Sequence, residues 1–156
     1  MNTKLTKSLF EIGLKAKSAS SILNTVTSNQ KNKFFDFAIE AIKENSDEIL
    51  LANQLDIKAA EGNNKDEAFI DRLALDKERI QGMCDTLNEI KSFKDPIGRV
   101  LSSWDRPNGL KISRVATPLG VIGLIFESRP NVAADAGGLC LKSGNAVILR
   151  SGKDGL

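Results

Sequence analysis

Two short apolar runs constrain the fold of this sequence more than any other feature. They are Val121–Phe126 and Ala146–Leu149. Each is apolar on both faces, which is typical of a central parallel strand covered by helices on both sides. The segment between them contains Pro130, which suits the first turn of a helix, and it ends in Lys142–Asn145, whose glycine predicts a left-handed C-cap. The sequence therefore predicts a βαβ unit with a right-handed crossover.

Residues 1–96 have mainly helical patterns, with apolar residues at the spacing of amphipathic helices. Thr27 and Gln30 form a capping-box pattern, and Asp76 is a candidate N-cap. Helices are predicted over residues 4–23, from Thr27, from Asn45 and from Asp76, with a short turn at 69–75 before the last. That last helix has one apolar stripe, made of Ile80, Met83, Cys84, Leu87 and Ile90. On pattern alone, this region is structural scaffold.

A β-hairpin is predicted over residues 97–116. Val100–Trp104 and Leu110–Val115 alternate with the period of a strand, and Arg106–Gly109 between them is a turn sequence. One face of the hairpin is polar, so we expect it to project from the main sheet or to lie at its edge. For Trp104 we predict a role in packing and not in ligand contact.

Within the predicted helix of the βαβ unit, Gly137 and Gly138 are unfavourable by about 1 kcal/mol each relative to alanine. Their presence predicts a close approach of this helix to the sheet. Cys140 lies on the apolar stripe of the same helix, as Cys84 does on its own, and the two cysteines form no C-x-x-C pair. Both are predicted to be buried, inert thiols and not nucleophiles.

The composition excludes several classes of site. The sequence has no histidine, which rules out a Ser-His-Asp or Cys-His arrangement and a histidine-based metal site within this chain. We predict no metal. The net charge of +2 is dispersed, which gives no case for nucleic-acid binding. No apolar run approaches a membrane span, and no signal-peptide core is present, so no membrane association and a cytoplasmic location are expected.

Polar loops follow both predicted strands of the βαβ unit. These loops are Glu127–Asn131 and Arg150–Asp154. Ligands of open parallel sheets bind outside the carboxyl ends of the strands, and the second loop combines glycine with two cations, which suits phosphate or a nucleotide ribose. Neither loop has a G-x-G-x-x-G or Walker A sequence. On residues alone, anion binding and ordinary surface turns are equally consistent with these loops.

Three segments, residues 106–112, 118–131 and 139–150, resemble the γ-glutamyl phosphate reductase family of the aldehyde dehydrogenase superfamily. The resemblance implies an α/β fold with a helical N-terminal region, a β-hairpin and the start of a parallel-sheet cofactor domain. It also implies NADPH-dependent reduction of L-glutamyl 5-phosphate to L-glutamate 5-semialdehyde, with phosphate release, in proline biosynthesis. That family forms a cysteine thioester, and its nucleophile matches neither cysteine of this chain.

By this resemblance, residues 1–156 are an N-terminal fragment, a partial NADP-binding domain whose βαβ unit spans 117–156. The catalytic domain is absent, so the fragment alone is expected to be inactive. The hairpin at 97–116 resembles an oligomerisation arm, which implies a homo-oligomer, and association with glutamate 5-kinase is a further expectation. The alternatives are a non-catalytic truncated nucleotide-binding or assembly module, and a related aldehyde dehydrogenase.

The resemblance also assigns residues. Asn131 is the candidate for an amide that holds the thioester oxyanion. Arg150 takes the place of a ribose-binding residue at a strand end, and together with Lys153 it is a candidate to contact the 2′-phosphate of NADPH. The implied cofactor-binding residues are Glu127, Ser128, Arg129, Pro130, Arg150, Ser151, Gly152 and Lys153.

Overall fold

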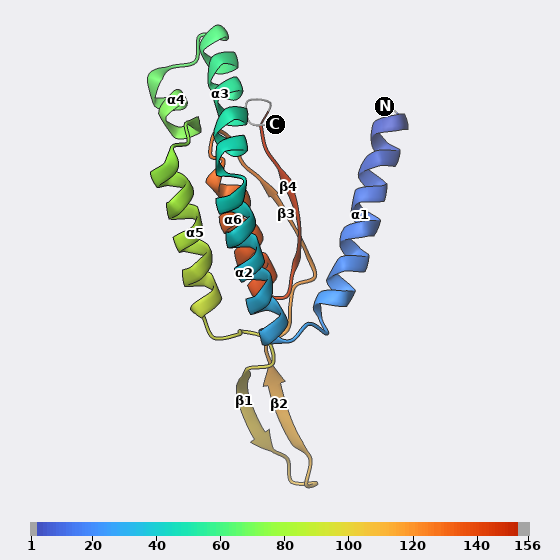
Figure 1. Ribbon diagram of the computed structural model, residues 1–156. Coiled ribbons are helices and arrows are strands. Elements are labelled where there is room, and N and C mark those ends of the chain that lie inside the picture. The colour runs from blue at the N-terminus through green and yellow to red at the C-terminus, as the bar shows by residue number, and fades with distance from the viewer. Residues whose placement is uncertain (1–2, 153–156) are drawn as a thin grey trace.

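The computed structural model describes residues 3–152, with side chains from Lys7 onward. Its elements follow in the order α1 (Thr3–Leu23), α2 (Ser28–Glu44), α3 (Ser46–Gly62), α4 (Glu67–Leu73), α5 (Lys77–Ser92), β1 (Val100–Asp105), β2 (Lys111–Val115), β3 (Val121–Ile125), α6 (Asn131–Lys142) and β4 (Ala146–Arg150) (Figure 1). None of the helices in this described part is long and apolar enough to cross a membrane. The order of a helical region, a hairpin and a βαβ unit matches the expectation from sequence.

The core lies where α2, α5 and α6 pack together. It consists of Phe35, Ile39, Cys84, Leu87 and Ile90, with apolar residues of α6 packed against it. The predicted stripe of α5 is therefore buried, although Met83 is only half-buried. This arrangement confirms that the helical region is organised around its apolar faces.

The close approach predicted from the two glycines of α6 exists, but it faces helices and not the sheet. A Cβ at Gly138 would lie 2.9 Å from Leu87 Cδ2, 3.3 Å from Ile90 Cδ1 and 3.3 Å from Phe35 Cε1. A Cβ at Gly137 would have nothing within 4 Å. The prediction was wrong about the partner because helical periodicity does not say which neighbour a small residue faces.

The helix starts follow their predicted caps, with one error. The capping box is present: the backbone N–H of Gln30 donates to Thr27 Oγ1 at 3.3 Å, and that of Thr27 donates to Gln30 Oε1 at 2.9 Å. Asp76 caps α5 by accepting from Arg79 N at 2.7 Å. The predicted turn at 69–75 is wrong over most of its length, because α4 forms there, capped by Asp66.

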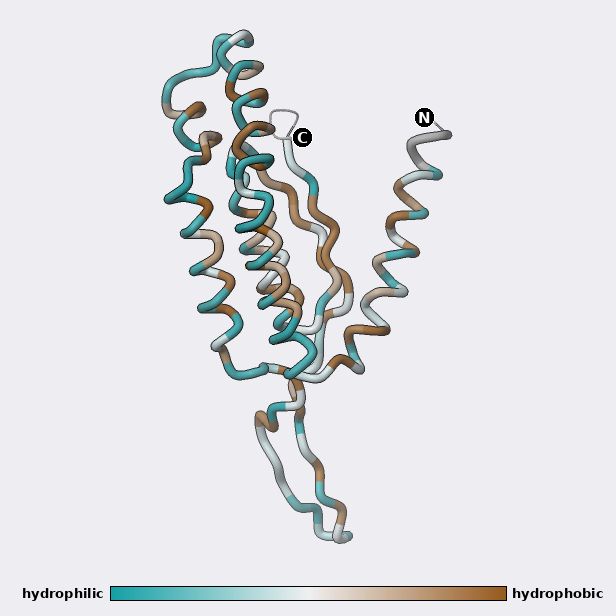
Figure 2. Tube along the Cα trace, in the orientation of Figure 1, coloured by the Kyte–Doolittle hydropathy of each residue, from teal (hydrophilic) through white to brown (hydrophobic). Residues whose placement is uncertain are grey.

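β3 and β4 pair in parallel, from Val121 opposite Ala146 to Ile125 opposite Arg150. Gly144, with φ of 70°, makes the predicted left-handed C-cap between α6 and β4. The strands were predicted to be buried on both faces, yet Ile125 is 83% exposed. Figure 2 shows the hydrophobic character of both strands. The strands are more exposed than predicted because this sheet has two strands among the described residues, and the helices that pack against them there are α1 and α6.

The hairpin of β1 and β2 projects away from the helices (Figure 1). Its turn is the predicted one, with Gly109 at φ of 84° and Arg106 N donating to Leu110 O at 2.9 Å. Trp104 lies opposite Ile112 and is 43% exposed, so its predicted packing role is not fulfilled within the described chain. Every strand residue of the hairpin is exposed.

A buried polar network joins the end of α6 to α2 and to the segment after α5. Lys31 Nζ donates to Asp95 Oδ2 at 2.9 Å and to the carbonyl of Lys142 at 3.2 Å. Asp95 also accepts from Ser28 Oγ at 2.7 Å and from Ile97 N at 3.0 Å. Lys142 Nζ donates to a backbone carbonyl of α5 at 2.7 Å and to a side-chain amide of α2 at 3.1 Å. These bonds satisfy cations that helix patterns alone assign to the surface.

Candidate functional site

The described parts of the two polar loops, residues 127–131 and 150–152, lie side by side at one edge of the sheet. β3 and β4 run parallel, so their carboxyl ends meet there, and Phe126 N donates to Arg150 O at 3.1 Å. The predicted site loops are therefore neighbours in the structure. This agrees with the rule that placed them at a common edge.

A pocket of about 240 Å³, which we call the strand-end pocket, opens between these loops and the α3–α4 region. The loops contribute Ser128, Arg129, Pro130, Ser151 and Gly152, and Phe126 lies just before the first loop. The helical region contributes Ile49, Ala52, Asn53, Asp56, Leu73 and Leu75. Five of the predicted cofactor-binding residues thus line one cavity. Glu127 and Arg150 are exposed and do not line it, and Lys153 lies outside the described residues.

The backbone of the first loop bends sharply at Ser128, whose φ is 48°. This left-handed conformation is uncommon for a residue other than glycine, and such positions cluster at ligand-binding sites. In the second loop, Arg150 Nη1 donates to Ser151 O at 2.7 Å. That bond holds the Arg150 side chain along the loop while leaving further guanidinium N–H groups for a ligand.

Asn131, the candidate oxyanion donor, lies on the other side of the first loop. It is the first residue of α6, it is exposed, and its Nδ2 donates to Asp135 Oδ2 at 2.9 Å. It lines a second pocket of about 520 Å³, which we call the charged pocket. This pocket is lined by Asp71, Arg72, Ala74, Leu75, Arg79, Gly82, Met83, Thr86, Arg129, Pro130, Asn131 and Asp135. Arg129 and Pro130 line both pockets, so the loop forms a wall between them.

Sequence reasoning missed the polar residues that the helices contribute. Asn53 is buried, donates to Leu73 O at 2.9 Å and accepts from Leu75 N at 2.7 Å, which fixes α3 against the α4–α5 connection. Burial raises the pKa of the nearby Asp56 carboxyl. Neither residue stands out in the sequence, because polar residues spaced three apart are common on helices.

The two cysteines stand apart from both pockets. Cys84 is 0% exposed and Cys140 is 7% exposed, and neither lines the strand-end or the charged pocket. Desolvation by burial raises the pKa of both thiols. The prediction of buried thiols is confirmed, and the raised pKa agrees with low reactivity because the thiolate is the reactive form.

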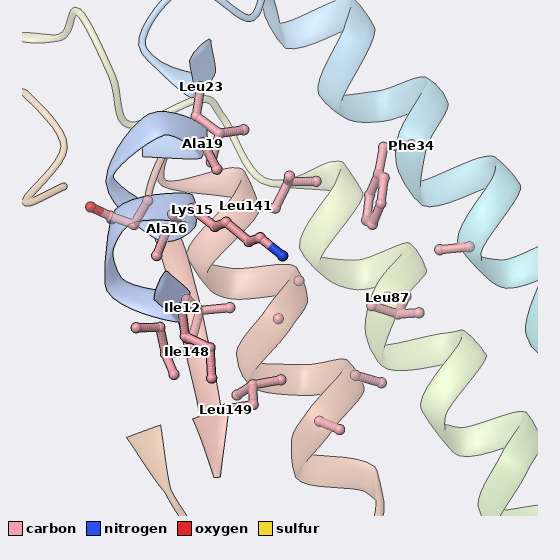
Figure 3. A pocket seen from close by; sticks show the side chains of 18 of the residues that line it. Ile12, Lys15, Ala16, Ala19, Leu23, Phe34, Leu87, Leu141, Ile148 and Leu149 are labelled. Atoms are coloured by element: carbon pink, nitrogen blue, oxygen red, sulfur yellow. The ribbon is translucent and has the colours of Figure 1, made fainter. Parts of the chain in front are cut away.

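The largest of these cavities is a different kind of space. It measures about 680 Å³ and lies between α1, α2, α6 and β4 (Figure 3). Its walls are almost entirely apolar, with Ile12, Leu141 and Ile148 around the extended side chain of Lys15 (Figure 3). No group of polar side chains converges in this cavity, so we place the candidate functional site at the strand ends.

Comparison with known proteins identifies the relatives of this chain. The γ-glutamyl phosphate reductase of Brucella suis is 52% identical over 154 residues, which covers 99% of this chain. That of Brucella anthropi is 54% identical over 144 residues, or 92% of this chain. The crystal structure of the Thermotoga maritima enzyme matches with a TM-score of 0.92 at 41% identity, over 94% of this chain. This chain is homologous to the γ-glutamyl phosphate reductases.

The homology covers about a third of a γ-glutamyl phosphate reductase: the chain spans 37% of the Brucella suis protein, 34% of the Brucella anthropi protein and 36% of the Thermotoga maritima structure. The yeast γ-glutamyl phosphate reductase structure also matches, with a TM-score of 0.89 at 32% identity. A putative aldehyde dehydrogenase from Bacillus subtilis shares the fold, with a TM-score of 0.66 at 19% identity. No family model matches the chain. The family resemblance and the aldehyde dehydrogenase-like α/β fold are confirmed.

Proposed function

We propose that this chain is the N-terminal part of an enzyme that reduces L-glutamyl 5-phosphate to L-glutamate 5-semialdehyde and releases phosphate, a step of proline biosynthesis. The observation that carries the proposal is the 52–54% identity to γ-glutamyl phosphate reductases over 92–99% of this chain. Both strand-end loops fall within the 99% that is matched. The 156 residues alone are expected to have no reductase activity.

In the proposed reaction a cysteine thiolate attacks the acyl phosphate and forms a thioester. Cys84 and Cys140 do not fit this role, because both are buried and neither lines a pocket at the strand ends. The nucleophile therefore belongs to the part of the relatives that this chain does not span. The role of this segment is to bind and orient the reactants.

The strand-end residues fit part of a nicotinamide cofactor, which when bound supplies the hydride. Ser151 and Gly152 line the pocket, and Arg150 is exposed beside it, a set suited to a ribose phosphate. The strand-end pocket has a volume of about 240 Å³. Sites that hold a whole small-molecule ligand usually have about 300–1,000 Å³, so the rest of the cofactor would lie outside this pocket. We propose NADPH, with Arg150 and Lys153 at its 2′-phosphate and residues 127–130 on the nicotinamide side.

Asn131 stays the proposed oxyanion donor. Asp135 accepts a hydrogen bond from its amide nitrogen, and that nitrogen has a second N–H to donate.

The proposed cofactor is tested on the full-length protein by following NADPH oxidation or formation. Wild type should use NADPH in preference to NADH. Arg150→Ala should raise KM for NADPH about tenfold or more, the loss expected for one charge-assisted contact, and should leave kcat little changed. Lys33→Ala, an exposed cation on α2, is the matched control. Equal use of NADH and NADPH by wild type would contradict the cofactor proposal, and absence of any reductase activity would contradict the function.

We also propose that the hairpin is an oligomerisation arm for a second copy of the chain. It projects from the helices, and it exposes Val100, Leu101, Trp104, Leu110, Ile112 and Val115. A projecting apolar surface of this kind is typical of an interface. Light scattering on the full-length protein should show an oligomer that Trp104→Ser with Ile112→Ser dissociates. A wild-type monomer would contradict the proposal.

A cytoplasmic location and an association with glutamate 5-kinase stay predictions. Cell fractionation would test the location, and co-purification would test the association.

A further inference from the structure

We propose that the charged pocket binds the α-amino acid end of the glutamyl substrate. In this arrangement Asp135 binds the α-ammonium group, and Arg72 and Arg129 bind the α-carboxylate. The inference rests on the proposed function, because γ-glutamyl phosphate has both of these groups at the end remote from its acyl phosphate. It assigns substrate recognition to residues of three separate segments that no sequence motif joins.

Asp135 has a carboxylate oxygen without a partner. Its Oδ2 accepts from Asn131 Nδ2 at 2.9 Å, while its Oδ1 is buried and has no hydrogen-bond partner among the described residues. An ionised oxygen in this condition is destabilising unless a donor is supplied. Asp135 lines the charged pocket, and the terminal torsion of its side chain is broad, so a rotation about that torsion would present a carboxylate oxygen to a ligand. An ammonium group, with three N–H donors, satisfies it.

The pocket also contains two guanidinium groups that the fold does not use. Arg72 and Arg129 both line it and are exposed, and neither guanidinium group makes a hydrogen bond or ion pair with another residue of the 3–152 segment. Arg79 differs, because its Nη2 pairs with Asp71 Oδ1 at 2.7 Å and its Nη1 donates to the Ala74 carbonyl at 2.7 Å. Arg79 and Asp71 thus stabilise the α4–α5 connection.

One carboxylate and two unpaired guanidiniums in a single cavity match a ligand with one cation and one carboxylate. The planar fork of arginine suits bidentate binding of a carboxylate. An apolar aldehyde would leave both guanidinium groups and Asp135 Oδ1 without a partner. The charge pattern therefore points to an amino acid, and not to a simple aldehyde, as the occupant.

The position of the charged pocket fits the same substrate. Arg129 and Pro130 line both this pocket and the strand-end pocket, where the cofactor is proposed to bind. A substrate held by its amino acid end in the charged pocket would therefore extend along the loop toward the proposed cofactor. Asn131, the proposed oxyanion donor, lines the same pocket as Asp135.

The test compares two substrates in the full-length enzyme, assayed in the oxidative direction with NADP and phosphate. L-Glutamate 5-semialdehyde has the α-ammonium group, and 5-oxopentanoate is the same carbon chain with the carboxylate but without the amino group. Asp135→Asn should lower kcat/KM for the semialdehyde about tenfold or more, the size expected for one charged contact, and leave that for 5-oxopentanoate unchanged. Arg72→Gln should lower both values. Asp85→Asn, an exposed carboxylate of α5 outside the pocket, should change neither.

The outcomes separate binding from a structural role. If Asp135→Asn lowers kcat/KM equally for both substrates, the residue acts by positioning Asn131 or by stabilising the fold, and the inference is wrong. No change with either substrate overturns it as well. A wild-type enzyme without activity on the semialdehyde would refute the proposed function itself, and the inference with it.

Discussion

Replacing Asp95 with asparagine tests whether the buried polar network holds the helices together. The Lys31 side chain is 2% exposed and that of Asp95 is 16% exposed, with Lys31 Nζ and Asp95 Oδ2 at 2.9 Å. Asp95→Asn keeps the shape but removes the negative charge. It leaves the Lys31 ammonium buried, close to that of Lys142, which is 5% exposed.

The expected loss is large for a single conservative change. Removing one partner of a buried ion pair leaves an uncompensated charge and destabilises by about 3–5 kcal/mol. Asp36→Asn is a matched control: Asp36 on α2 pairs with Lys91 on α5, and the two side chains are 56% and 31% exposed. Exposed pairs contribute roughly 0–1 kcal/mol. The two variants should therefore differ by more than about 2 kcal/mol in the free energy of unfolding.

The pH dependence gives an independent check. Burial by itself raises the pKa of Asp95, but hydrogen bonds from Lys31, Ile97 N and Ser28 outweigh it, and the pKa falls below its ordinary value of 3.8. Because the folded pKa is the lower one, the stabilisation by the Asp95 carboxylate is fully present above 3.8 and is lost as pH falls through the folded value. The difference in free energy of unfolding between wild type and Asp95→Asn should therefore be constant near neutral pH. It should shrink in acid, as pH falls through the pKa of Asp95 in the folded protein.

Urea denaturation followed by far-ultraviolet circular dichroism measures these differences. Trp104 is the single tryptophan of the chain and lies on the exposed hairpin, so its fluorescence would not report on the helical core. Equal stability of Asp95→Asn and Asp36→Asn at neutral pH would refute the reasoning. A difference between wild type and Asp95→Asn that persists undiminished in strong acid would refute the assignment to the Asp95 charge.

Three further predictions concern the glycines of α6, the capping box of α2 and the two cysteines. Gly138→Ala should destabilise by about 1–3 kcal/mol because its Cβ would clash with α5, whereas Gly137→Ala should stabilise by up to about 1 kcal/mol, and the same sign for both would contradict the packing. Thr27→Ala should cost about 1 kcal/mol through loss of the capping box, and an unchanged unfolding midpoint would argue against it. Cys84 and Cys140 should react with a thiol reagent only as fast as the chain unfolds, since both are buried; rapid labelling without denaturant would contradict this.

Much of the secondary structure could be predicted because its determinants are local. The capping box at Thr27 involves a residue three positions away, and the hairpin turn at Arg106–Gly109 is set by its own four residues. The βαβ unit follows from two apolar runs and Gly144. The turn predicted at 69–75 failed because α4 is short, and its N-cap Asp66 precedes too few apolar residues to show a period.

The long-range contacts could not be predicted. Lys31 and Asp95 are 64 residues apart, and lysine is almost never fully buried unless it is paired, so the pattern of α2 gave no reason to bury Lys31. The same limit explains the wrong partner assigned to Gly138. Ile125 was also predicted wrongly: its strand is apolar on both faces, but the described residues leave the Ile125 side chain exposed. The chain spans 34–37% of the relatives that it matches.

The candidate site also has one part that could be predicted from the sequence and one part that could not. The rule for parallel sheets brought 127–130 and 150–152 to one edge, whereas the charged pocket draws Arg72 and Asp135 from helices that no local pattern connects. The wall between the two pockets contains the left-handed bend at Ser128. Since Arg129 and Pro130 face both sides, the conformation of this loop sets the relative position of both proposed ligands. A substitution that alters the bend should thus change KM for cofactor and substrate together, whereas one at Asp135 should affect the amino acid alone.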